Sequence, residues 1–241
     1  MQSLSHPSDR LSLLLLPFHA VAFWARNQLA FWIAALPVAV LAAALTWFEG
    51  ADDRWVRLPL FAVVYALFLD RWHRIVLLAD APISEETDTL RHSLIDVRFL
   101  LFAVGVFALA IALEVLPIID VLVWSLIVAP LLLYLPAHSV GEPIGLGTAW
   151  RLARPVQITL FVTVCATAIL AMLAQDAADI GALLLPKKPW LAPALAGAAR
   201  LVDCLLLAIL GYVTASLYRA LSGWQPPEPE DRPYRTRRRS S

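Results

Sequence analysis

Residues 27–48 read NQLAFWIAALPVAVLAAALTWF, a run of 22 residues without a formal charge between Arg26 and Glu49. A helix of about 20 such residues spans the roughly 30 Å hydrocarbon core of a bilayer. Two further uncharged runs of 21 residues each follow, at 121–141 and 155–175. The sequence therefore predicts an integral membrane protein with several helical spans.

The overall composition favours the same class. Of the 241 residues, 60% are apolar and 16% are charged, whereas soluble domains average about 45–50% apolar and about 25% charged residues. Shorter uncharged runs at 58–69, 99–113 and 204–218 reach about 20 residues when a flanking charge at the interface is included, because long basic side chains extend to the headgroups. We therefore predict an all-α membrane domain with six spans, at 29–48, 56–76, 97–117, 119–137, 155–174 and 197–218.

The basic residues of the loops predict the orientation. With these six spans, 14 of the 19 Lys and Arg residues fall on one side and five on the other. The positive-inside rule then places both termini in the cytoplasm. The short connections near 49–54, 117–120 and 175–196 are expected outside.

Three segments are interpreted as amphipathic helices in the cytoplasmic interface, each just before a pair of spans. They are 11–26, 84–98 and 144–154. For the first, a signal peptide is the alternative, but Ser12, His19 and Arg26 recur every seven residues and share one helical face. The pattern predicts three units of one interfacial helix and one hairpin, at 8–79, 84–137 and 144–219.

The last 18 residues differ from the rest. Four of the first ten, from Trp224 onward, are proline, and the end reads RTRRRSS. Such a stretch buries too little apolar area to offset its ordering entropy. We therefore divide the chain into a membrane domain, 1–223, and a disordered basic cytoplasmic tail, 224–241, which would attract anionic lipid.

Motifs that would indicate catalysis are missing from the sequence. It contains no G-x-S-x-G, no H-E-x-x-H and no Walker A motif, and Cys165 and Cys204 belong to no metal-binding pattern. The basic residues are spread over several loops, so nucleic acid is not an expected partner. The sequence predicts a protein that is not an enzyme and needs no cofactor or metal.

Two groups of ionisable residues are candidates for function. Asp70, His73 and Arg74 lie three and four residues apart at the inner end of the second span, so they share a helical face and could pair. They would form a proton relay or headgroup site, or they simply end the span at the interface.

Asp203 lies inside the sixth span, where an unpaired carboxylate costs about 2.5 kcal/mol or more. Arg200, three residues earlier on the same face, is its expected partner. His138 and Ser139 are adjacent after the fourth span and are interpreted as part of a turn, since a nucleophile and its base must meet in space.

Three short stretches resemble a group of six-span bacterial inner-membrane proteins. They are RWHRIVLL at 71–78, LPAHSVGEP at 135–143 and GTAWRL at 147–152. The group includes the YciC-type proteins and the membrane domain attached to some glycerophosphodiester phosphodiesterases. The resemblance implies a six-span fold in the inner membrane. It implies no phosphodiesterase activity, because the catalytic domain of those fusion proteins is absent from this sequence.

Two classes of function remain open. The first is a non-enzymatic protein that scaffolds a membrane or cytoplasmic partner or organises lipid. The second is a small transporter, or the membrane subunit of one, in which Asp70, His73 and Asp203 would carry protons or bind substrate.

Overall fold

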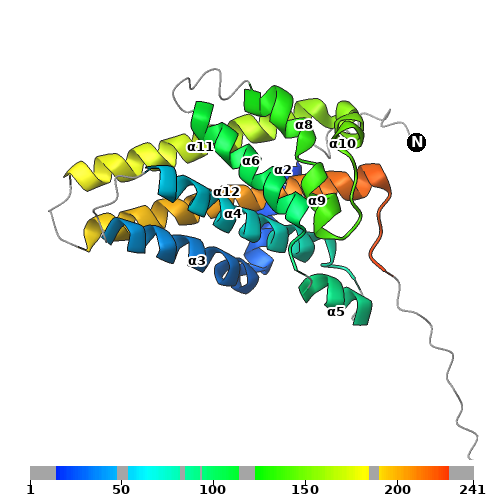
Figure 1. The fold of residues 1–241 in the computed structure, drawn as a ribbon, viewed down its shortest axis with the longest axis horizontal. Coiled ribbons are helices and arrows are strands. Elements are labelled where there is room, and N and C mark those ends of the chain that lie inside the picture. The colour runs from blue at the N-terminus through cyan, green and yellow to red at the C-terminus, as the bar shows by residue number, and fades with distance from the viewer. Residues whose placement is uncertain are drawn as a thin grey trace, which may run out of the picture.

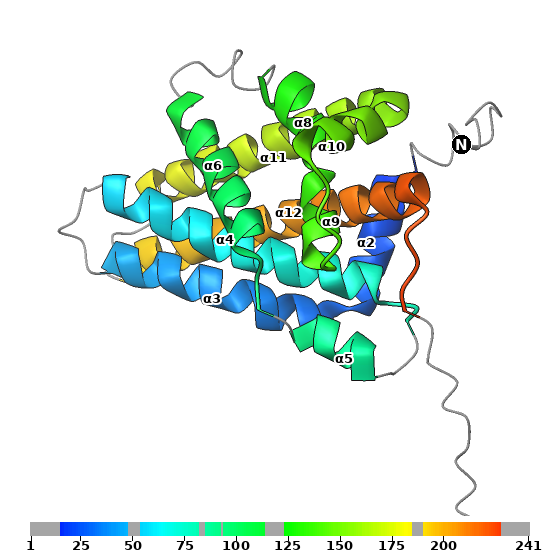
Figure 2. The ribbon, with the colours of Figure 1, turned by 45° about the vertical axis from the view of Figure 1, so that its right-hand side comes forward.

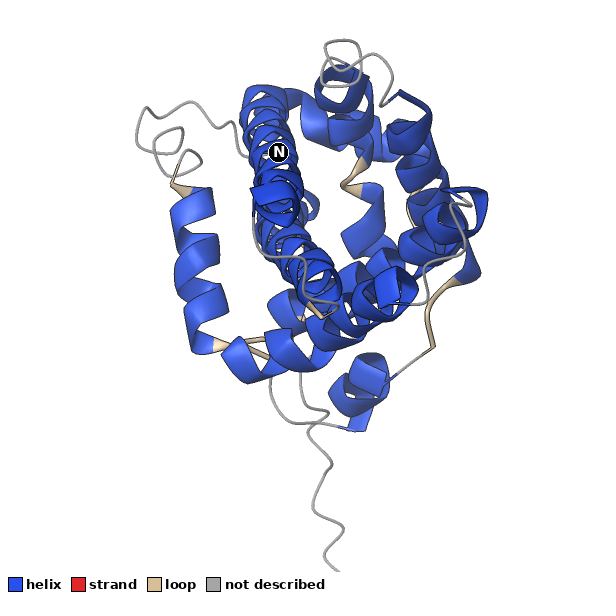
Figure 3. Ribbon diagram, turned by 90° about the vertical axis from the view of Figure 1, so that its left-hand side faces the viewer, coloured by secondary structure: helices blue, strands red, loops and turns tan. Residues whose placement is uncertain are grey.

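The computed structural model describes residues 15–47, 54–81, 85–92, 94–113, 123–184 and 190–227. These residues form helices and loops without a strand, which confirms the all-α class for the described part of the chain (Figure 3). The helices are α2 Leu16–Arg26, α3 Gln28–Trp47, α4 Arg54–Leu77, α5 Glu85–His92, α6 Val97–Leu113, the π-helix η1 Trp124–Val128, α8 Ala129–Leu131, α9 Tyr134–Ser139, α10 Leu146–Ala153, the 3-10 helix η2 Arg154–Val156, α11 Gln157–Leu184 and α12 Leu191–Ser222.

Three helical stretches are long and apolar enough to cross a membrane, namely Gln28–Trp47, Leu146–Ala178 and Leu191–Ser222. They contain most or all of the predicted spans 29–48, 155–174 and 197–218, and they indicate a multi-pass membrane protein. α4 is also long, with 24 residues, about 36 Å at the rise of an α-helix. Its end carries Asp70, Arg71, His73 and Arg74, so its apolar part is shorter than the helix itself.

The predicted fourth span, 119–137, is not one continuous helix in its described part. The chain forms η1, α8 and α9, with a turn at Leu132 and Leu133. Pro130 and Pro136 explain these breaks, because proline has no N–H and its ring clashes with the carbonyl four residues earlier. Those positions, Leu126 and Leu132, fall in the π-helix and in the turn.

The predicted interfacial helix at 84–98 is also interrupted. α5 ends at His92 and α6 begins at Val97. Asp96 begins the new helix, because its Oδ1 accepts the backbone N–H of Arg98 at 2.9 Å. The third interfacial segment is present as α10, and α2 covers the described part of the first. The residues that the sequence offers as caps for the first two segments, Ser8 or Asp9 and Ser84, lie outside the described residues.

α12 is the central helix of the bundle and packs along α3, α4 and α11 (Figure 2). α3 and α11 run away from the end of the bundle at which α2, α9 and the last turn of α12 lie, and α4 and α12 run back toward it (Figure 1). We call this the terminal end. The three predicted units are not separate in space, because α12 of the third unit packs on α3 and α4 of the first.

Small residues let these helices approach closely. A Cβ on Gly197 of α12 would lie 3.2 Å from the carbonyl oxygen of Ala39 in α3. A Cβ on Gly211 would lie 3.0 Å from side-chain carbons of both Leu69 and Trp72 in α4. Close backbone approach at small residues is the usual packing of helices in membranes.

The largest buried side chains gather toward the terminal end and include Phe31, Trp72, Phe99, Leu133 and Tyr218. Trp224 is buried in the same cluster. Trp224 is the first residue of the predicted tail, and its indole ring packs in the core. Residues 228–241, the rest of the predicted tail, lie outside the described residues.

Candidate functional site

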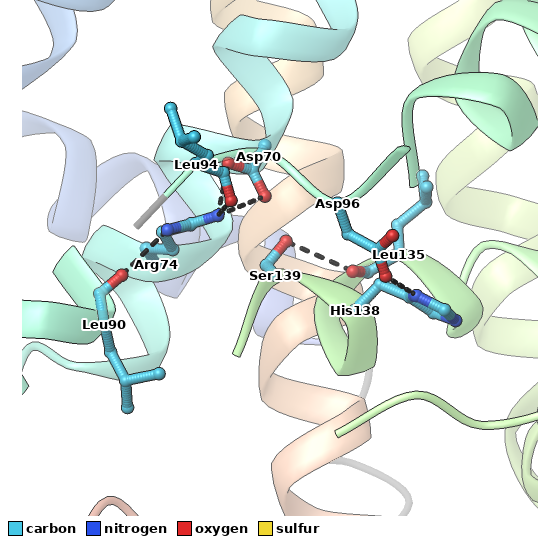
Figure 4. A network of polar contacts seen from close by, with 8 residues as sticks. All are labelled: Asp70, Arg74, Leu90, Leu94, Asp96, Leu135, His138 and Ser139. Carbon is cyan, nitrogen blue, oxygen red and sulfur yellow. Dashed lines mark hydrogen bonds and ion pairs between the residues drawn. The ribbon is translucent and has the colours of Figure 1, made fainter. Parts of the chain in front are cut away.

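Asp70 and Arg74 form a buried ion pair on α4. Arg74 Nη2 lies 2.9 Å from Asp70 Oδ2, and the two side chains are 5% and 9% exposed for Arg74 and Asp70. The same guanidinium donates to the backbone oxygens of Leu90 at 2.8 Å and Leu94 at 3.3 Å (Figure 4). Arg74 thus neutralises a carboxylate and fastens α5 and the following loop to α4.

His73 does not join this pair, although the spacing places it on the same face. Its Nε2 lies 3.1 Å from Oγ1 of Thr214 in α12. The Thr214 hydroxyl proton is directed to the carbonyls of Leu210 and Gly211, at 3.0 and 3.1 Å. Nε2 is therefore the donor to Thr214, and Nδ1 has no hydrogen-bond partner among the described residues. His73 is a buried contact between helices.

Trp72 makes the neighbouring contact between the same two helices. Its Nε1 donates to the carbonyl of Ala208 at 2.8 Å. Trp72 and His73 therefore lie on the two sides of Gly211, where a larger residue would meet both Leu69 and Trp72. The predicted cluster of α4 thus divides into an ion pair that holds α5 and two rings that hold α12.

Asp203 has the predicted partner and one more. Arg200 Nη1 donates to Asp203 Oδ2 at 2.8 Å, which confirms the expected pairing. The hydroxyl of Tyr65 in α4 donates to the same oxygen at 2.8 Å. The Arg200 guanidinium also lies over the ring of Phe61, 5.2 Å from its centroid. Arg200, Asp203 and Tyr65 thus link α12 to α4 at a second place, apart from the contacts of Trp72 and His73.

A further polar pair, Asp96 and His138, was not predicted from the sequence. His138 Nδ1 donates to Asp96 Oδ2 at 2.6 Å, and the His138 side chain is 1% exposed. The ring of Tyr134 lies 4.0 Å from that of His138. His138 Nε2 has no hydrogen-bond partner in the described part of the chain.

The environment of Asp96 favours its charged form. Partial burial alone would raise the pKa of this carboxyl, but the hydrogen bonds from His138 and from the Arg98 backbone, with the charge of Arg98, lower the pKa below its ordinary value. Asp96 therefore caps α6 with one oxygen and holds α9 with the other.

The Ser139 hydroxyl donates to the carbonyl of Leu135 at 3.1 Å within α9, so Ser139 and His138 do not form a nucleophile and base. Both residues belong to helix α9, and the turn expected here begins after them, where Gly141 adopts a φ of +76°. A left-handed backbone of this kind favours glycine.

The polar network of Figure 4 lies at the terminal end, where α4, α9 and the start of α6 meet. Among the described residues, no group of three His, Cys, Asp or Glu side chains is arranged to hold a metal ion. The ion pairs and hydrogen bonds of this network neutralise charges and connect helices. The three stretches that resemble the six-span group lie in α4, in α9 with its turn, and in α10.

No protein-family model matches the chain, and neither a curated protein nor a solved structure matches it.

Proposed function

We propose that this chain is a non-enzymatic, multi-pass protein of the bacterial inner membrane that scaffolds a partner protein or organises lipid. It crosses the bilayer six times and keeps both termini in the cytoplasm. The observation that carries this proposal is the state of the ionisable side chains. Asp70 is neutralised by Arg74, and Asp203 is held by Arg200 and Tyr65, so these carboxylates join helices instead of facing a path for substrate.

The bundle supports more crossings than the three apolar helices alone. α4 packs along both α3 and α12 and runs antiparallel to α3 (Figure 1). A membrane that holds α3 and α12 would therefore hold most of α4 as well. Large apolar side chains such as Leu67, Leu101 and Ile169 are exposed on helices α4, α6 and α11, at 46%, 68% and 50%, as lipid-facing residues would be.

A relation to the YciC-type group is part of this proposal. It rests on the short stretches of α4, α9 and α10, which the fold brings to one end of the bundle. The relation would account for a shared arrangement at that end without any catalytic residue.

One observation favours the alternative, a small transporter. The segment from Trp124 to Ser139 is a broken helix that begins with a π-helical turn, and discontinuous helices often form the binding sites of transporters. In that function Asp70, His73 and Asp203 would carry protons or bind substrate.

Reconstitution of the full chain into liposomes separates the two functions. We expect Asp203→Asn to lower the amount of folded protein. We expect proton-coupled uptake by this variant, as by the wild type, to be no different from that of empty liposomes. Asp80→Asn is the matched control, because Asp80 is exposed and pairs with Arg219 at the surface. A folded Asp203→Asn protein that loses an uptake activity present in the wild type would establish the transporter. Copurification of one stoichiometric partner would support the scaffold.

A further inference from the structure

Four arginines at the terminal end share an arrangement that the other arginines with described side chains lack. Arg26, Arg71, Arg98 and Arg154 are exposed, and their guanidinium groups make no hydrogen bond or ion pair among the described residues. By contrast, Arg74, Arg200 and Arg219 pair with aspartates. Arg91 and Arg151 donate to Leu78 and Thr148. We call the four unpaired residues the arginine ring.

Each member of the ring lies three or four residues from a large, exposed apolar side chain. The pairs are Arg26 with Leu29, Arg71 with Leu67, Arg98 with Leu101 and Arg154 with Ile158. The apolar partners are exposed by 75%, 46%, 68% and 77%.

Three of these pairs each lie along one helical stretch, and their direction is consistent. α6 and the stretch from η2 into α11 run away from the terminal end, and there the apolar residue follows the arginine (Figure 1). Arg26 ends α2, and Leu29 lies in the first turn of α3. α4 runs toward that end, and there the apolar residue precedes the arginine. For Arg71, Arg98 and Arg154 the charge therefore lies nearer the terminal end than its apolar neighbour. This is the order expected where hydrocarbon gives way to headgroups.

The length of α12 is consistent with a boundary between hydrocarbon and headgroups at the height of the arginine ring. Trp72, the residue after Arg71, donates to Ala208 of α12, and Gly211 lies against Leu69 and Trp72. Residues 191–210 of α12 are 20 in number, which is about 30 Å of helix and matches the hydrocarbon core. The remaining turns of α12 would then project beyond the hydrocarbon at the terminal end.

We propose that the arginine ring binds the phosphate groups of anionic phospholipids, one at each guanidinium, in the leaflet at the terminal end. Guanidinium groups form paired hydrogen bonds with phosphate. A neutral lipid offers the same phosphate with a compensating cation. The charges of the ring, which no ion pair among the described residues neutralises, therefore favour a lipid with net negative charge, although the charge of Arg98 also acts on Asp96. The site rests on the proposed membrane insertion and is separate from the basic residues beyond 227.

The test compares lipids retained by the purified full chain from nanodiscs of phosphatidylcholine containing phosphatidylglycerol, counted by native mass spectrometry at low and high salt. We expect the wild type to retain phosphatidylglycerol selectively. Replacing the ring by Gln should reduce this preference about fivefold at each site. The four Lys replacements should keep most of it, since the charge remains. If the fourfold Gln variant does not fold, the double variants Arg26→Gln with Arg154→Gln and Arg71→Gln with Arg98→Gln each carry half of the test.

Two control variants assign the preference. Arg151→Gln with Arg219→Gln removes two arginines of the same end that already have partners, and it should retain the preference. Gln at Arg232, Arg235, Arg237, Arg238 and Arg239 should also retain it. Loss of preference in that variant alone, or equal retention of both lipids by the wild type, overturns the ring. A chain that stays dispersed without detergent would instead overturn the proposed membrane function itself.

Discussion

At the scale of single residues, Asp203 shows how a carboxylate is accommodated among apolar helices. It accepts hydrogen bonds from Arg200 on its own helix and from Tyr65 on α4, both at 2.8 Å. A buried charge with two donors is stable, whereas removal of one partner leaves it under-satisfied. The two donors should therefore contribute differently to stability. Arg200 neutralises the charge of Asp203, and Tyr65 makes the contact between the helices.

We predict that Tyr65→Phe lowers the free energy of unfolding by about 1 kcal/mol, since one hydrogen bond is lost. Arg200→Ala should cost more, about 1.5–3 kcal/mol, because the partly buried carboxylate loses its charge partner. Thermal unfolding in detergent micelles measures both. Tyr212→Phe is the control, because that ring packs on Phe23 and its hydroxyl makes no hydrogen bond among the described residues. Equal effects of the two Tyr→Phe changes would contradict the role of Tyr65.

Asp96 gives a pH-dependent prediction. Its pKa is lowered in the folded chain from 3.8, with partial burial opposing the shift and the bonds from His138 and Arg98 outweighing it. A lowered folded pKa means that the stabilisation is complete above the unfolded value and is lost as the pH falls through the folded value. The wild type should therefore lose stability below about pH 4 more steeply than Asp96→Asn.

Asn is a suitable replacement because it caps a helix as well as Asp does, so the comparison isolates the charged bond to His138. Unfolding midpoints between about pH 3 and pH 7 provide the measurement. Parallel curves for the two proteins would show that the Asp96 carboxylate contributes no net stability.

The sequence allowed only the local part of these contacts to be predicted. Arg200 and Asp203 are three residues apart, so helical geometry alone brings them together. Tyr65 is 138 residues from Asp203, and Asp96 is 42 residues from His138. Those contacts depend on which helices are neighbours in the fold. The spacing of residues along the chain does not show this.

At the scale of helices, the contact of α4 with α12 depends on Gly211. We predict that Gly211→Ala destabilises the protein by about 1–3 kcal/mol, because the new methyl group would lie 3.0 Å from both Leu69 and Trp72. Gly147→Ala in α10 is the matched control, since nothing lies within 4 Å of its added Cβ. The control should be neutral or stabilise by up to about 1 kcal/mol.

Near-ultraviolet circular dichroism of the two variants should show a weaker α4–α12 contact as a smaller aromatic signal, because Trp72 packs at this contact. If the Gly211→Ala protein is as stable as the Gly147→Ala protein, α4 shifts without a loss in the free energy of unfolding. The close approach of α4 and α12 would then not contribute to stability.

The sequence predicted where the long helices lie, but it did not predict where helices are broken. The lengths of the uncharged runs correctly placed α3, α11 and α12. The same argument did not predict the breaks within 119–137, because an uncharged run says nothing about whether the helix is continuous, and Pro130 and Pro136 interrupt it. The amphipathic pattern likewise did not predict the break within 84–98, where the side chain of Asp96 begins a new helix. Proline alone does not predict such a break either, because Pro37 lies inside the continuous helix α3 and Pro59 inside α4.

At the scale of the whole molecule, the fold concentrates its polar contacts at one end. The pairs Asp70–Arg74 and Asp96–His138 and the surface pair Asp80–Arg219 all lie toward the terminal end. Toward the opposite end lie the last turns of α3 and α11 and the first turns of α12, with Asp176 and Asp179 on α11. This asymmetry agrees in direction with the excess of basic residues from which the sequence predicted the cytoplasmic side.

The topology prediction follows from that asymmetry. We expect residues 50–54 and the connection after α11 to lie outside, and α5 and α10 to lie in the cytoplasm. The structure sharpens the second site, because α11 continues to Leu184 and α12 begins at Leu191. Single cysteines at Asp52 and Lys188 should therefore react with a membrane-impermeant maleimide in intact cells. Cysteines at Asp88 and Thr148 should react only after the membrane is opened, because charged loops of the cytoplasmic side do not cross the bilayer.

Cys165 and Cys204 are replaced first to give a cysteine-free background. Cys204 is buried, so Cys204→Ala is a milder change than Cys204→Ser, which would place a hydroxyl among apolar groups, and the background must retain the unfolding midpoint of the wild type. Labelling at Asp88 in intact cells would mean that the orientation is inverted or that the number of crossings has changed.

The pattern at Lys188 distinguishes these two outcomes. If Asp88 is labelled and Lys188 is protected, the whole bundle is inverted, because the two positions still lie on opposite sides of the membrane. If Asp88 is labelled and Lys188 still reacts, both lie outside and an even number of crossings separates them, instead of the three that six spans require. The broken segment at 124–139 is where that count would have changed, because its helix is too interrupted to span a bilayer by length alone.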